Sequence, residues 1–158
     1  MILKYFETSE RGGLMTSSAG EIRFMRAGEW LAALVGAINC VLVPAVFAQS
    51  QRPLFPLPGL YFVQIALLGV LVLAFVAARP QLKGRWAALP WLAAGVMLAF
   101  VILGGFSIGP FLIPAFIAFV VTGVLGDLQA GGVMGRHVGY LLVAAVVQAG
   151  VMGLMILF

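Results

Sequence analysis

One stretch of the chain without any charged residue, from Trp86 to Gly126, constrains the fold more than any other feature. As a single helix of about 40 residues, rising about 1.5 Å per residue, it would reach about 60 Å, twice the thickness of a bilayer's hydrocarbon core. The run must therefore turn back on itself, and its glycine-rich centre suits a turn, because glycines accept positive φ and a proline suits the first turn of a new helix. This hairpin is predicted at Gly104, Gly105, Gly109 and Pro110.

The composition indicates that the solvent of this fold is lipid. The chain is 63% hydrophobic and 9% charged, whereas soluble domains average roughly 45–50% and about 25%. A soluble domain of this size leaves roughly a third of its unfolded surface exposed, and so few charges cannot cover it. A disordered tail, a coiled coil and an ordinary cytosolic enzyme are excluded. Cys40 is the only cysteine, so an intrachain disulfide is excluded as well.

We therefore predict an all-α integral membrane protein, a compact bundle of five transmembrane helices. A bundle of four is the alternative, in which the 86–126 run contains a re-entrant segment. Each predicted span is close to the length of about 20 apolar residues that a bilayer requires. The five spans are Trp30–Ala48, Leu60–Ala78, Trp86–Leu103, Pro110–Leu125 and Val138–Phe158.

The chain divides into a cytoplasmic segment, residues 1–29, and a membrane bundle, residues 30–158. Within the first segment, Ser18 and Glu21 have the spacing of a capping box. This spacing favours a short helix on the inner membrane surface, although a frayed tail leading into the first span fits equally well. Met15 is an alternative start to Met1.

Basic residues predict the orientation, because Lys and Arg concentrate in short cytoplasmic loops. With five spans and a cytoplasmic N-terminus, eight of the nine basic residues lie inside and only Arg52 lies outside. We therefore expect an outward C-terminus, in a bacterial-type inner or plasma membrane. Since these residues border the spans, the net charge of +4 is interpreted as membrane-edge charge, and no nucleic-acid partner is expected.

A cleaved signal peptide is the rival interpretation of the first span. Small residues near Ala48 resemble a cleavage site, and Arg23 and Arg26 would form the basic region. We favour a retained span, because the apolar stretch is longer than the roughly 7–15 residues of a signal peptide and contains Asn39.

Catalytic chemistry finds little support in the sequence. No predicted span contains an ionisable residue, which is the usual mark of chemistry within a membrane. Glu29 and Asp127 border spans and are interpreted as ordinary boundary charges. We expect no enzymatic activity and assign no catalytic, cofactor-binding or metal-binding residue.

His137 is the only histidine, which excludes a bis-histidine haem and a His-rich zinc site. No cofactor is predicted. Ligation of one pigment or haem by His137 stays open beside the simpler interpretation, an imidazole among the headgroups.

Three amides lie near the middle of their predicted spans: Asn39, Gln64 and Gln148. Amides hydrogen-bond across helix interfaces in membranes. They are therefore candidate interhelical contacts, or contacts to a solute if all three converge.

Small residues recur every four positions in two of the predicted spans. Such faces allow helix backbones to approach closely. In the last span they are Ala145, Ala149 and Gly153, and in the third they are Gly95 and Ala99. Each face is predicted to contact another helix.

These features favour a non-catalytic accessory, assembly or packing subunit of a larger membrane complex. Its partners would be the lipid bilayer and other membrane subunits or copies of itself. The alternative is a small transporter or binding protein for an apolar or neutral solute.

Overall fold

The structure, a computed structural model, describes residues 19–50, 59–79, 84–130 and 134–157, and this part of the chain is helical apart from one tight turn. Its five long helices are each long and apolar enough to cross a membrane, which confirms the predicted all-α bundle. The elements are α2 (Ala19–Ser50), α3 (Gly59–Ala78), the short 3-10 helix η2 (Gly84–Ala88), α4 (Leu89–Leu103), α5 (Gly109–Ala130) and α6 (Met134–Leu157).

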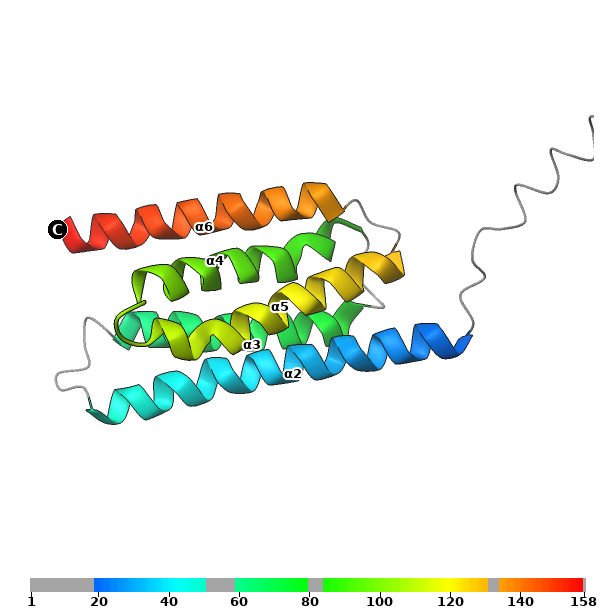
Figure 1. The fold of residues 1–158 in the computed structure, drawn as a ribbon, viewed down its shortest axis with the longest axis horizontal. Coiled ribbons are helices and arrows are strands. Elements are labelled where there is room, and N and C mark those ends of the chain that lie inside the picture. Colours follow the sequence, from blue (N-terminus) through cyan, green and yellow to red (C-terminus); the bar gives the residue numbers. More distant parts are fainter. Residues whose placement is uncertain (1–18, 51–58, 80–83, 131–133, 158) are drawn as a thin grey trace, which may run out of the picture.

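The helices run alongside one another, with α2 and α6 on opposite sides of the bundle (Figure 1). Helix α5 packs against α2 and α4, while α4 also packs against α6 and α2 also packs against α3. Helices α4 and α5 therefore hold the centre. Their buried side chains, among them Met97, Leu112 and Phe119, form the core together with buried residues of α2, α3 and α6.

Helix α2 begins well before the predicted first span. Residues 19–29 form the first turns of the same continuous helix rather than a separate one (Figure 1). The helix continues through Glu29 because this side chain is buried and paired inside the bundle. Helix α5 likewise extends to Ala130, past the predicted end at Leu125, and carries Asp127 with it.

Glycines set the distance between the helices at several crossings. A Cβ on Gly69 of α3 would lie 2.7 Å from the Cβ of Cys40 and 3.0 Å from the Cα of Ala37 on α2. A Cβ on Gly36 would overlap the ring of Phe119 on α5. Close backbone approach of this kind is the usual source of stability between membrane helices, where lipid removes the hydrophobic driving force.

The predicted hairpin is present, with α4 ending at Leu103 and α5 beginning at Gly109. The backbone N–H of Gly109 donates to the carbonyl of Gly104 at 2.7 Å. The expected positive φ was wrong: φ is −87° at Gly104, and neither Gly105 nor Gly109 is in the left-handed region. The glycines are needed for space instead. A Cβ on Gly109 would overlap the carbonyl oxygen of Val101 and lie 2.6 Å from the Gly104 carbonyl carbon.

This geometry predicts unequal costs for two substitutions in the hairpin. Gly109→Ala should reduce the free energy of unfolding by about 2 kcal/mol, because its Cβ meets backbone atoms that cannot move away. Gly105→Ala should cost much less, since its Cβ would lie 3.1 Å from the Ile102 carbonyl oxygen at the exposed tip. Thermal unfolding in detergent measures both. Equal midpoints would show that the turn does not depend on close approach at Gly109.

Candidate functional site

Charged and polar side chains gather at one end of the bundle, where all five long helices meet. Glu29 and Asp127, interpreted from the sequence as boundary charges, are each only 2% exposed. Charges are almost never buried without a partner. Their partners therefore define the site.

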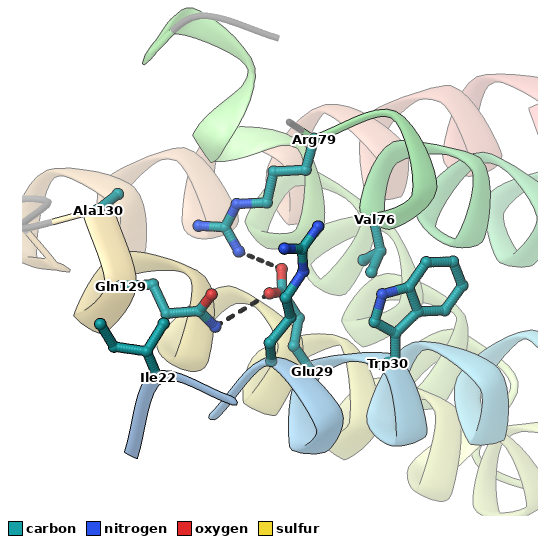
Figure 2. A pocket seen from close by; sticks show the side chains of 8 residues that line it. Ile22, Glu29, Trp30, Val76, Arg79, Gln129 and Ala130 are labelled. Atoms are coloured by element: carbon teal, nitrogen blue, oxygen red, sulfur yellow. Dashed lines mark hydrogen bonds and ion pairs between the residues drawn. The ribbon is translucent and has the colours of Figure 1, made fainter. Parts of the chain in front are cut away.

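Glu29 of α2 is held by two side chains. Its Oε1 accepts a hydrogen bond from Nη1 of Arg79, with which it also forms an ion pair. Its Oε2 accepts a 3.0 Å hydrogen bond from Nε2 of Gln129 on α5 (Figure 2). Arg79 directly follows α3, and its Nη2 donates to the backbone carbonyl of Gly126 on α5. This cluster connects α2, α3 and α5.

Asp127 of α5 is held by two other helices. The indole Nε1–H of Trp91 on α4 donates to Oδ2 at 3.1 Å. The Nδ1 of His137 on α6 lies 2.8 Å from both carboxylate oxygens. An ionised carboxylate only accepts hydrogen bonds, so in a pair with ionised Asp127 the donor is Nδ1. This second cluster connects α4, α5 and α6.

We name the two clusters together the inner-end network, after the orientation that the basic residues predict: Glu29, Arg79, Gln129, Trp91, Asp127 and His137. They adjoin on α5, where Gly126 serves the first and Asp127 the second. Between them they include a residue from, or directly next to, every long helix. The network therefore links the whole bundle through polar contacts.

Two glycines of α5 make room for this network. A Cβ on Gly123 would lie 2.8 Å from the indole of Trp91, and one on Gly126 would lie 3.2 Å from the Arg79 guanidinium. Sequence analysis missed both residues and the pairing they permit. The available signal was a pair of glycines nearly one helical turn apart, the second immediately before Asp127.

The depth of the network follows from helix lengths. At a rise of about 1.5 Å per residue, the stretch of α5 from Gly109 to Asp127 measures about 27 Å, and the stretch of α6 from His137 to Leu157 measures about 30 Å. Both lengths are close to the thickness of the hydrocarbon core, about 30 Å. The network therefore lies where a spanning bundle would leave the hydrocarbon.

The three amides do not converge. Gln64 of α3 and Gln148 of α6 bond reciprocally, with Nε2 to Oε1 distances of 2.9 and 3.3 Å. The Oδ1 of Asn39 is buried and has no hydrogen-bond partner among the described residues. Two of the three amides therefore form an interhelical contact, and Asn39 does not join it.

The predicted small-residue faces have different outcomes within the chain. Gly95 of α4 packs against the Leu141 carbonyl and lies close to Ala144 on α6, and Ala99 of α4 is buried. On α6, however, Ala145 and Ala149 are only partly buried and Gly153 is exposed. The face of α6 that packs on the bundle instead carries His137, Leu141, Gln148 and Met152. The rotation of each helix about its own axis decides which face packs on the bundle, and residue spacing in the sequence does not specify that rotation.

The charged and polar groups of the site pair mainly with one another. Within the described ranges, no three His, Cys, Asp or Glu side chains come together as a metal site. Asp127 occupies Nδ1 of His137, whose ring is buried beside Tyr140 at a centroid distance of 6.0 Å. Any ligand to this imidazole would have to use Nε2.

Comparison with known proteins adds no assignment: the chain matches no protein-family model, no curated protein and no solved structure.

The inner-end network predicts a large effect of removing one ionic partner. Arg79→Met leaves the Glu29 carboxylate buried without a cation, which should reduce the free energy of unfolding by about 3–5 kcal/mol. Adding Glu29→Gln to that variant should recover much of the loss, because no charge then remains unpaired. Thermal unfolding in detergent measures both, with Arg23→Gln, an exposed position on α2, as control. An Arg79→Met variant as stable as the control contradicts the network.

Proposed function

We propose that this protein is a non-catalytic membrane subunit that docks a transmembrane helix of a partner subunit, or of a second copy, through the outward face of α6. The proposal includes the orientation predicted from the basic residues, with the inner-end network at the cytoplasmic side of a bacterial-type inner or plasma membrane. The supporting observation is the distribution of residues around α6.

The four described glycines of α6 that face open space lie on one side of this helix. A Cβ added at Gly135, Gly139, Gly150 or Gly153 would meet nothing within 4 Å. Gly135 and Gly153 are separated by about five full helical turns and therefore project in the same direction. This outward glycine face is opposite the side that packs on α4.

Glycine has a cost within a helix, about 0.5–1 kcal/mol relative to alanine. A face in contact with lipid alone gains nothing in return, since bulky and small residues are equally soluble there. A face that packs on a second helix does gain stability, because small residues allow the two helix backbones to approach closely. The outward glycine face thus favours a helix as its neighbour.

Replacing these glycines tests the proposal. Gly150→Leu combined with Gly153→Leu should abolish co-purification of the partner chain, or self-association, from mild detergent. The thermal midpoint of the isolated chain should change little, because no described atom lies near either Cβ. Ala45→Leu enlarges an exposed residue of α2 and should leave the assembly intact. Unchanged assembly in the double variant would contradict docking through α6.

A second candidate, a binding protein for an apolar solute, is favoured by one pocket at the opposite end of the bundle. This pocket of about 470 Å³ is lined mainly by apolar and aromatic side chains, including Phe47, Tyr61, Phe100 and Met152. Its volume lies within the roughly 300–1,000 Å³ range of small-molecule sites. The Gln64–Gln148 pair counts against a polar solute path, because the two amides bond to each other.

A further inference from the structure

A pocket of about 280 Å³ opens beside the inner-end network, between α2, the end of α3 and the end of α5. Figure 2 shows Glu29, Arg79 and Gln129 joined at its base, with Trp30 and Val76 along one side. The outward glycine face of α6 contributes none of the lining residues. The pocket is therefore a separate feature from the one that carries the proposed function.

The charges lining this pocket do not cancel. The Glu29 carboxylate is engaged by Arg79 and Gln129, with one hydrogen bond to each oxygen. Arg26 lies one turn before Glu29 on α2, lines the same pocket and is exposed. Within the described ranges, no hydrogen bond or ion pair joins Arg26 to Glu29. With two guanidinium groups and one carboxylate, the pocket carries one net positive charge.

The walls around this charge are apolar. Ile22, Trp30 and Val76 line the pocket together with the charged groups. Trp30 is 39% exposed, and tryptophan is enriched where membranes meet water. A ligand that fits both features combines one anionic group with an apolar body.

The position of the pocket matches the headgroup layer. The stretch of α2 from Glu29 to its end at Ser50 measures about 31 Å at about 1.5 Å per residue, which is about one hydrocarbon thickness. Arg26 lies almost one turn farther out. Basic pockets between membrane helices at this depth bind anionic lipid headgroups.

We propose that this pocket binds the phosphate of an anionic phospholipid. Arg26 donates to the phosphate oxygens, while Arg79 stays paired with Glu29, so the net positive charge that attracts the phosphate is that of Arg26. Ile22, Trp30 and Val76 contact the glycerol and the upper part of the acyl chains. Free inorganic phosphate has the same charge chemistry but gains nothing from these apolar walls, so the lipid is the favoured source.

Titration of phosphatidylglycerol onto the delipidated full chain in a neutral detergent tests this assignment, with native mass spectrometry reporting the one-to-one complex. Arg26→Gln should weaken binding about tenfold, as expected for loss of a hydrogen bond to a charged group. Arg26→Lys should retain most of the affinity. Arg23→Gln removes the same charge one turn away, at a residue outside the pocket, and should change affinity less than about twofold.

The unaltered chain supplies the second arm of the experiment. Phosphatidylglycerol should bind more tightly than phosphatidylcholine, whose choline cation would lie near the arginines, and millimolar inorganic phosphate should not displace it. Equal losses in the Arg26→Gln and Arg23→Gln variants would overturn the proposal in favour of diffuse surface charge. Displacement by inorganic phosphate, or equal binding of the two lipids, would also overturn it. None of these results depends on whether α6 docks a partner.

Discussion

Two buried carboxylates, Glu29 and Asp127, limit the ways in which the helices of this bundle can pack. A charge removed from water is strongly destabilising unless its partners are in place. Here the Glu29 carboxylate is bonded from the end of α3 and from α5, and the Asp127 carboxylate is bonded from α4 and from α6. The network is satisfied only when the helices are assembled in this arrangement. We infer that it selects one packing among the many that apolar surfaces alone would permit.

The rest of the packing is arranged around this requirement. Gly123 and Gly126 allow Trp91 and Arg79 to lie against α5, and the hairpin that leads into Gly109 joins α4 to α5 at the other end. A second polar contact, Gln64 with Gln148, links α3 to α6 deeper within the bundle. The bundle thus uses a few specific polar contacts where lipid offers little hydrophobic driving force between helices.

Much of the fold could be predicted from the sequence, because the lengths of the uncharged apolar runs alone require several membrane crossings and a turn. Five helices long and apolar enough to span a membrane, and the hairpin between Leu103 and Gly109, are confirmed on that basis. The predicted reason for the hairpin glycines was wrong. A glycine can be required for a positive φ or for lack of space for a Cβ, and composition does not distinguish the two. Helices α2 and α5 continue beyond the predicted spans at Glu29 and Asp127, because a charge ends an apolar run in the sequence but does not end a helix.

The inner-end network could not be predicted, because its partners are distant in sequence. Glu29 and Arg79 are 50 residues apart, and Trp91 and Asp127 are 36 apart. Sequence gives the depth of each residue along its helix, but not the rotation of the helix about its axis. Because of the same limit, the sequence could not distinguish Gly95, which packs against α6, from the predicted face of α6, which lies mostly away from the bundle.

The three tryptophans offer the most direct test of the network. Trp91 is 3% exposed and donates to Asp127, whereas Trp86 is 54% exposed, so their indole N–H signals in an NMR spectrum of the labelled chain should differ. We predict one indole proton that exchanges slowly with deuterated water and shifts in an Asp127→Asn variant, while those of Trp30 and Trp86 exchange fast and do not shift. Three indole protons that exchange at similar rates and ignore the Asp127→Asn change would contradict the buried network.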